Sequence, residues 1–343
     1  MPTKQSSALQ QAIWEAINNK TKPVGSLGRL EALAAQLASV QQTLTPTAGR
    51  CKLTVFAADH GIAEAGVSAF PQEVTRQMLS NFLAGGAAAN VLAQALAVEF
   101  AVVDAGVRGQ AMAHPALISR RIGNGTNNSA ERAAMSAQQF KHALDVGTLI
   151  GSQDEHEVAC YGEMGIANTS SASLVAAKLL NLPVARLVGR GSGIDDDGLI
   201  RKQRVLDAAA QRTPAQLGPQ EAMREYGGFE TVMLTGAIMG AAASGKLVLI
   251  DGFIATVSAL AALRLMPEAR SHLVFAHRSA EAAHTAVLEA LDAVPLLDLD
   301  LRLGEGTGAL LAWPLVRAAA AMLSDMASFD SAGVSDHTSL NLK

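Results

Sequence analysis

The chain has 343 residues, which is long enough for one large domain and a smaller one with a substantial buried core. Its hydrophobic fraction of 49% comes mainly from Ala, Leu and Val, whereas aromatic residues make up 4% and charged residues 17%. That composition is typical of helices packed on a buried parallel sheet. A net charge of -4, with basic residues scattered along the chain, argues against nucleic acid as the main partner.

The cysteines and the apolar runs indicate a reducing compartment such as the cytoplasm. Cys51 and Cys160 lie in apolar stretches without the spacing of metal ligands or of a disulfide framework, so we expect two buried free thiols. The first eight residues lack the apolar core of a signal peptide, and charged residues or proline interrupt the longest apolar runs. The sequence therefore predicts a cytoplasmic protein that does not associate with membranes.

Short apolar runs alternate with helical patterns along most of the chain. Amphipathic helices are expected near both ends, at Ser7–Asn18, Leu30–Gln42 and Leu310–Met326. Six runs between them are expected to be strands: Leu53–Ala57, Phe100–Val103, Val158–Tyr161, Ala185–Val188, Leu247–Ile250 and Leu273–Phe275. This alternation predicts an α/β fold with a doubly wound, mostly parallel, Rossmann-like sheet.

Polar residues follow the first expected strand, at the edge where ligands bind in open α/β sheets. Asp59 and His60 would form a metal pair or act separately. Because neighbouring residues on a strand point to opposite faces, we favour a capping role for Asp59. Farther along, Phe70 and Met78 would either wall a flat apolar pocket or pack in the core.

Two glycine-rich loops are predicted to follow strands. Gly162–Ser171 reads GEMGIANTSS and leads into a helix of small residues, so its amides and hydroxyls would bind phosphate or cap that helix. Gly189–Gly193 reads GRGSG and precedes a helix containing Lys202. It matches neither a dinucleotide fingerprint, nor a P-loop, nor a serine-hydrolase elbow. A lysine near such a loop suits a phosphate monoester, although it would also suit a solvated helix.

The C-terminal part carries further polar segments. His277–Glu281 and His284 would face the same cleft as the glycine loops or cap the following helix. The last residues, Ser331–Lys343, form a polar tail that we expect to be mobile.

Arg302–Ala309 reads RLGEGTGA and holds one acid, Glu305, between two glycines. The glycines favour turns and leave the backbone bare for close approach to a ligand. Apolar runs flank the loop, and desolvation there would raise the pKa of the carboxyl, which suits a general base. Alternatively, Glu305 would complement the dipole of the helix that follows.

Several long segments resemble the nicotinate-nucleotide:dimethylbenzimidazole phosphoribosyltransferases of cobalamin nucleotide-loop assembly, the CobT family. The matching segments cover nearly the whole chain: KPVGSLGRLE at 22–31, AADHGI at 57–62, GVSAFPQEVT at 66–75, GEMGIANT at 162–169, GRGSGIDD at 189–196, DGF at 251–253 and RLGEGTGA at 302–309. Ala167, Ser192 and Arg278 differ from what many relatives have at these places.

The resemblance implies an enzyme that moves the phosphoribosyl group of nicotinate mononucleotide to 5,6-dimethylbenzimidazole. Inversion at the sugar carbon would give α-ribazole 5'-phosphate and nicotinate. The resemblance also implies that Glu305 is the proton acceptor and that Glu163 is a second acid near the ribose. By analogy, the nucleotide and its phosphate would lie near Gly165, Asn168, Thr169, Ser170, Gly191, Ser192, Gly193 and Lys202. The benzimidazole would lie near Phe70, Met78 and Leu303. No metal and no cofactor are implied.

The resemblance also implies a homodimer and two domains in each chain. Residues 1–45 and 308–343 would form a small helical domain, and residues 46–307 a Rossmann-like domain that carries the active-site loops. Two other functions are open from the residues alone. One is a nucleotide N-glycosyl hydrolase or phosphorylase, and the other is a nucleotide-binding protein without catalysis. The identity of the natural azole or phenol acceptor does not follow from the sequence.

Overall fold

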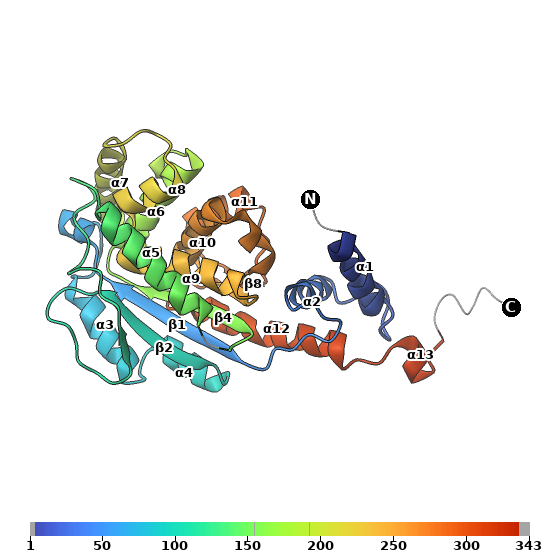
Figure 1. The fold of residues 1–343 in the computed structure, drawn as a ribbon. Helices are drawn as coiled ribbons and strands as arrows, with labels where there is room; N and C mark the ends of the chain where they lie inside the picture. The colour runs from blue at the N-terminus through green and yellow to red at the C-terminus, as the bar shows by residue number, and fades with distance from the viewer. Residues whose placement is uncertain (1–3, 154, 192, 336–343) are drawn as a thin grey trace.

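The computed structural model describes residues 4–335 apart from 154 and 192, with side chains from residue 8 onward. Its main sheet has six parallel strands in the order β3-β2-β1-β4-β5-β6, which confirms the predicted doubly wound fold (Figure 1). The strands are β1 Cys51–Ala58, β2 Glu99–Gly106, β3 Leu117–Ser119, β4 Val158–Met164, β5 Leu247–Ile250 and β6 Leu273–Phe275.

The strand order reverses between β1 and β4, since β1 pairs with β2 on one side and β4 on the other. Parallel sheets of this kind bind ligands outside the carboxyl ends of the strands at the reversal point. Residue pairing aligns Phe56 with Glu163 and Ala57 with Met164, so the last residues of β1 and β4 reach this edge together. The fold therefore places the expected ligand-binding edge at the ends of β1, β4 and β5.

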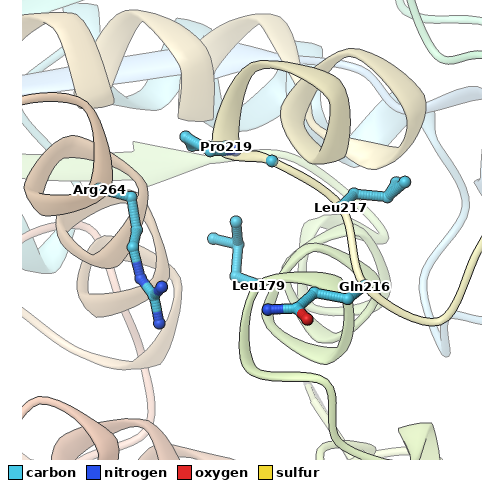
Figure 2. A pocket seen from close by; sticks show the side chains of 6 residues that line it. Leu179, Gln216, Leu217, Pro219 and Arg264 are labelled. Carbon is cyan, nitrogen blue, oxygen red and sulfur yellow. The ribbon is translucent and has the colours of Figure 1, made fainter.

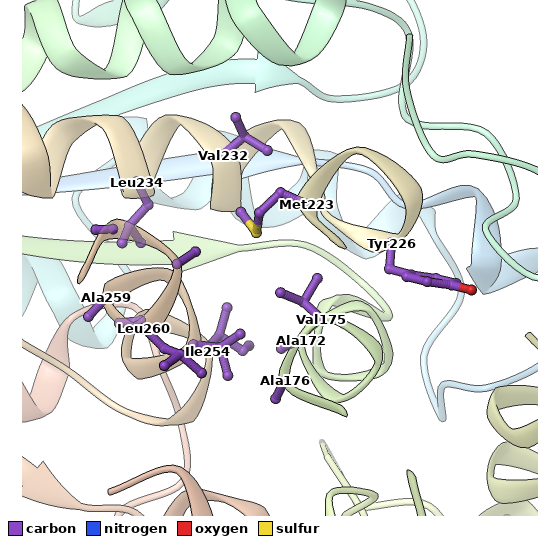
Figure 3. Packing of buried hydrophobic residues seen from close by; sticks show 14 of the residues in the cluster. Ala172, Val175, Ala176, Met223, Tyr226, Val232, Leu234, Ile254, Ala259 and Leu260 are labelled. Atoms are coloured by element: carbon purple, nitrogen blue, oxygen red, sulfur yellow. The ribbon is translucent and has the colours of Figure 1, made fainter. Parts of the chain in front are cut away.

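One face of the sheet is covered by helices from the middle of the chain. The strong apolar character of α9 and α10 fits their burial, since a helix that is hydrophobic all round belongs in a core. Figure 3 shows side chains of α6, α8, α9 and α10 packed together in this layer. The helices are α5 Ala137–Ser152, α6 Asn168–Leu180, α7 Asp196–Ala210, α8 Pro219–Tyr226, α9 Phe229–Ala243, α10 Phe253–Leu265 and α11 Ala282–Ala290.

The other face is covered by helices from both chain ends and by the pair between β1 and β2. The chain ends meet where Lys20 bridges to Ser328. The helices on this side are α1 Lys4–Asn18, α2 Arg29–Val40, α3 Glu73–Leu83, α4 Ala88–Ala95 and α12 Thr307–Ser324, and the short α13 Phe329–Ala332 follows α12. A second apolar core joins these helices, apart from α13, to the sheet. The division into two domains at residues 45 and 308 stays a prediction.

Three local predictions need correction. Ala185–Val188 is no strand: Val184–Arg186 forms a short 3₁₀ helix after Pro183, with Leu187 buried in the helical layer. Such a short apolar run has no periodicity that separates a strand from a buried turn. Gly162 and Glu163 lie inside β4, so the loop after this strand begins at Gly165. Strand β3 and the small parallel pair β7 His277–Arg278 with β8 Leu297–Asp298 had not been expected.

The remaining features concern the thiols and the C-terminus. Cys51 and Cys160 are buried free thiols, as predicted, and their sulfur atoms lie 3.3 Å apart on neighbouring strands. Ser331 lies in α13, so the expected mobile tail does not start there, and residues 336–343 lie outside the described residues. Helix α12 is long and apolar enough to cross a membrane by length and composition, but 61% of it is buried inside the protein.

Candidate active site

Three buried acids converge at the carboxyl edge of the sheet. Glu163 ends the buried part of β4, Asp251 directly follows β5, and Glu305 lies in the loop before α12. The negative charge of Asp251 acts on both glutamates, and that of Glu305 acts on Glu163. The three carboxyl groups therefore form one electrostatic cluster beside the point where the strand order reverses.

The backbone around Glu305 is held in an unusual conformation. Gly304, Glu305 and Gly306 have φ values of 87°, 60° and 81°, in the left-handed region that glycine adopts freely and glutamate does not. Close packing enforces this shape, because a side chain on Gly162 of β4 would overlap the carbonyl group of Glu305. A left-handed non-glycine residue costs about 1–2 kcal/mol, a cost that recurs at functional sites.

The cap of α12 is Asp251 and not Glu305. The two carboxylate oxygens of Asp251 accept hydrogen bonds from the amides of Gly306 (3.2 Å) and Ala309 (3.0 Å) in the first turn of this helix. Glu305 accepts instead from the amide of Ala89 (3.3 Å), at the start of α4. In the described structure the hydrogen bonds that cap α12 are therefore made by Asp251, and the dipole alternative for Glu305 stays a prediction.

Burial raises the pKa of Glu305 above its ordinary value, as the flanking apolar runs led us to expect. The Ala89 amide opposes this shift, while the negative charge of Asp251 adds to it. A carboxylate whose charged form is destabilised in this way binds a proton more strongly, which is the property of a general base.

Glu163 lies on the other side of the same loop. The Asn168 side-chain amide donates a hydrogen bond to Oε2 of Glu163, while Oε1 lies where a side chain on Gly304 would begin. Burial, followed by the charges of Asp251 and Glu230, raises the pKa of Glu163 to about 8. At neutral pH this carboxyl group therefore carries a proton and can donate a hydrogen bond.

His60 and Asp59 bond different partners. His60 Nε2 lies 2.5 Å from Oε1 of the buried Glu230 on α9. Asp59 accepts from the Arg108 amide (2.7 Å) in the loop after β2, so it caps that loop. Within the described part of the chain, no three His, Cys, Asp or Glu side chains are grouped to hold a metal ion.

The two glycine loops meet at Lys202. This lysine is buried, and its Nζ donates to Thr169 Oγ1 and to the carbonyl of Gly189, both at 3.0 Å. Burial lowers the pKa of Lys202 to about 8, although the charge of Glu281 opposes the shift. Gly191 lies against both Thr169 and Lys202. The geometry thus brings together the first turn of α6, the Gly189–Gly193 segment and a cation.

The other expected phosphate ligands are placed less directly. Gly165 lies against His60 and the carbonyl of Ala58, and the buried Ser170 hydroxyl has no hydrogen-bond partner among the described residues. Gly193 has a φ of 107° and open space where a side chain would be. Ser192 lies outside the described residues.

The expected azole-binding residues are surface side chains. Phe70 is 48% exposed in the segment before α3, and Leu303 is 58% exposed next to Gly304. Met78 lies on α3 and packs, half-buried, against the core on the face of α12. All three side chains are apolar and at least partly exposed, and of the three only Leu303 lies in the Glu305 loop.

A separate hollow lies away from these residues. A pocket of about 390 Å³ is lined by Leu179, Leu217, Arg264 and their neighbours (Figure 2). Leu179 lies at the end of α6 opposite to Asn168, about 16 Å along the helix. This pocket is therefore not part of the acid cluster.

Sequence reasoning gave no role to Asp251 and none to Glu230. Both are buried acids, and Asp251 belongs to a segment that the resemblance had already marked, DGF at 251–253. Strand-end acids followed by glycine were the available signal for Asp251. Glu230 lies in the first turn of α9, and its pairing with His60 across 170 positions has no sequence signal.

The fold and the site are those of an α/β enzyme that gathers acids at the carboxyl edge of its sheet, next to glycine loops that contact a buried lysine. A family model described as "Phosphoribosyltransferase" (DBI_PRT) matches residues 3–334. The chain belongs to this family.

Named relatives agree over nearly the full length. The nicotinate-nucleotide–dimethylbenzimidazole phosphoribosyltransferases of Cupriavidus taiwanensis and Dechloromonas aromatica are each 50% identical to it, over 96% of this chain and 96% and 97% of theirs. The crystal structure of CobT from Thermus thermophilus superposes with a TM-score of 0.92 at 43% identity. That match covers 96% of this chain and 99% of the solved one.

Proposed function

We propose that this enzyme transfers the phosphoribosyl group of nicotinate mononucleotide to 5,6-dimethylbenzimidazole, with Glu305 as the general base. The names of the relatives supply the two substrates. The observation that carries the role of Glu305 is its release from helix capping: Asp251 holds the first turn of α12, which leaves a desolvated carboxylate free to take a proton.

The chemistry needs a base and no acid. Nicotinate leaves C1 of the ribose as a neutral pyridine ring, since the bonding electrons return to the positively charged ring nitrogen. One benzimidazole nitrogen forms the new bond to C1 and becomes positively charged, and the other nitrogen gives its proton to Glu305. A positioned base contributes about 10²- to 10⁴-fold to such a step. Its negative charge also stabilises the cationic sugar and azole in the transition state.

Glu163 is the partner of the ribose in this proposal. Its raised pKa keeps it protonated at neutral pH, which supports hydrogen bonding to a sugar hydroxyl over stabilisation by charge. Asn168 holds one of its oxygens and connects it to the first turn of α6. The ribose would therefore lie between Glu163 and the loop of Glu305.

The nucleotide phosphate would lie at Lys202, where the buried ammonium has only neutral oxygens as hydrogen-bond partners in the described structure. A phosphate dianion there would gain a charge-assisted hydrogen bond. Gly165, Thr169, Ser170, Gly191, Ser192 and Gly193 are proposed to surround it with amides and hydroxyls. Phe70, Met78 and Leu303 are proposed to contact the flat azole, and a homodimer is proposed as the assembled form.

The test is a chromatographic and mass-spectrometric assay of the purified protein with nicotinate mononucleotide and dimethylbenzimidazole. We expect α-ribazole phosphate and nicotinate in equal amounts. Glu305→Gln should bind nucleotide with wild-type affinity and lose about 10²- to 10⁴-fold in kcat. Unchanged turnover in that variant would eliminate Glu305 as the base.

An acceptor-free reaction is the control for the substrate class. Nicotinate release without azole would identify a hydrolase instead, and the absence of turnover with a panel of azoles and phenols would identify a binding protein. Sedimentation velocity of the same preparation tests the dimer, which a single monomer peak at assay concentration would contradict.

A further inference from the structure

The loop of Glu305 has the wrong intrinsic conformation for a glutamate, so something outside the loop must hold it. Helix α12 cannot do so alone, because its N-cap residue is Gly306, which has no side chain to accept the free amides of the first turn. The Thr307 amide and hydroxyl both donate to the carbonyl of Gly304, which closes the turn locally. The amides of Gly306 and Ala309 remain.

Asp251, which follows strand β5, accepts hydrogen bonds from both of those amides. Its Oδ2 accepts from Gly306, the residue directly after Glu305, and its Oδ1 accepts from Ala309. The side chain is 2% exposed, so water does not compete for these bonds. Asp251 thereby links the end of β5 to the backbone of Glu305 through a single peptide unit.

His277 supports Asp251 from behind. Its Nε2 lies 3.6 Å from Oδ1 of Asp251, and its ring lies against Gly308 in the first turn of α12. Burial lowers the pKa of His277, but the nearby carboxylate of Asp251 outweighs this, and the net shift is upward. His284 is not part of this arrangement, since its ring accepts from the Ser279 amide and bonds Thr256.

We propose that Asp251 is a positioning residue for the transfer reaction: it clamps the first turn of α12 so that Glu305 keeps its left-handed backbone and directs its carboxylate at the reacting azole. This inference rests on the proposed function and deepens it, because it assigns a role to the aspartate of the DGF segment. Asp251 does not contact substrate in this proposal and acts through Glu305.

The charge of Asp251 gives the clamp a second effect. Three features of the described structure face the Glu305 carboxylate: the Ala89 amide from α4, Glu163 from β4 and Asp251 after β5. The amide lowers the pKa of Glu305 and Asp251 raises it. Removal of the Asp251 charge should therefore lower this pKa, so that the acidic limb of the pH–rate profile moves to lower pH.

The experiment compares Asp251→Asn with Asp104→Asn. Asp104 is an internal match: it is equally buried at a strand end and accepts from two backbone amides, Gly106 (3.0 Å) and Val107 (2.8 Å), but its loop does not carry Glu305. Both substitutions preserve size and place an amide group where a donor needs an acceptor: a backbone amide at position 251 and the Arg121 guanidinium at position 104. Both should lower thermal stability, whereas only the first should change the chemical step.

For Asp251→Asn we expect kcat to fall by about 10- to 100-fold, because small misplacement of a catalytic group has effects of that size. The KM for nicotinate mononucleotide should stay within about threefold, and the acidic limb of kcat should move to lower pH. Asp104→Asn should keep both kcat and the limb. If Asp251→Asn gives no cooperative thermal transition, Asp251→Ser is the second variant, since its hydroxyl can accept one of the two bonds.

A folded Asp251 variant with wild-type kcat, or with a reduced kcat and an unmoved acidic limb, would overturn the inference. Equal loss of kcat in Asp104→Asn would do the same, because it would show a general effect of strand-end caps. Failure of the proposed function is a separate result: the wild-type protein would then form no α-ribazole phosphate.

Discussion

The two ends of the site are built in opposite ways. At the acid end, Glu163, Asp251 and Glu305 are fixed by strands, a helix start and close backbone packing, and their like charges repel. At the phosphate end, Lys202 donates hydrogen bonds to a hydroxyl and a carbonyl. The negative charge of Glu281 favours the charged form of this lysine without a hydrogen bond to it in the described structure. The acid end disfavours the charged forms of its glutamates, while the phosphate end holds a cation whose hydrogen-bond partners are neutral.

Each end contains one group whose pKa is about 8: an acid whose pKa is raised and a lysine whose pKa is lowered. Burial raises the pKa of Glu163 from 4.5 and lowers the pKa of Lys202 from 10.5, because in each case desolvation disfavours the charged form. At neutral pH the acid is therefore neutral and the lysine is still largely charged. The same physical effect makes one group a hydrogen-bond donor and prepares the other for a phosphate.

The largest effect at the phosphate end should follow from Lys202→Met. A hydrogen bond to a charged group contributes about 1.5–3 kcal/mol, so the KM for nicotinate mononucleotide should rise about 10- to 150-fold. Turnover at saturating nucleotide should change much less, because Lys202 binds ground state and transition state alike. Steady-state kinetics at varied nucleotide measures both quantities.

Lys178→Met is the matched control for that variant. Lys178 is also a buried lysine that donates to backbone carbonyls, those of Ala210 (2.6 Å) and Pro214 (2.8 Å), but it lies near the other end of α6. It should lose stability and keep the nucleotide KM. If the two variants raised KM equally, Lys202 would be a structural lysine and the phosphate would bind elsewhere.

Glu163→Gln tests the acid end through pH. In the wild type, turnover should fall as pH rises through about 8, because Glu163 loses the proton with which it donates. Saturating nucleotide removes Lys202 from this limb, since a bound phosphate stabilises its charge. Because the glutamine side chain can donate at all pH values, the fall of kcat at basic pH should disappear in the variant. Its kcat at pH 7 should be about tenfold lower than that of the wild type, because glutamine makes a less favourable hydrogen bond at this position.

The same variant makes a prediction about stability. The folded pKa of Glu163 lies above its unfolded value, so the folded state binds the extra proton and stability falls as pH rises from about 4.5 to about 8. Glu163→Gln should flatten this part of the curve of thermal midpoint against pH. A wild-type curve with no such decline, or an equally steep decline in the variant, would mean that Glu163 is ionised in the folded protein.

The contrast between the two ends also explains what the sequence could predict. The doubly wound parallel sheet and the Glu305 loop follow from local patterns and from the rule for parallel sheets, whereas the grouping of both glycine loops with Lys202 was implied by the resemblance. The cap by Asp251 and the pair of His60 with Glu230 join residues 55 to 170 positions apart, so no local pattern contains them. The strand expected at Ala185–Val188 was wrong because a local apolar pattern was present, but the run packs in the helical layer and not in the sheet.

The smallest effect is expected at the azole surface, which belongs to neither charged end. Phe70→Ala should raise the KM for dimethylbenzimidazole by about two- to tenfold, the contribution of one aromatic contact of about 0.5–1.5 kcal/mol. The nucleotide KM and the thermal midpoint should not change, because the ring is half exposed and remote from Lys202 in sequence and role. Leu149→Ala, a 53% exposed apolar side chain on α5, is the control for general surface effects. An unchanged azole KM in Phe70→Ala, or an equal rise in the control, would remove Phe70 from the acceptor site and leave Met78 and Leu303 as its proposed walls.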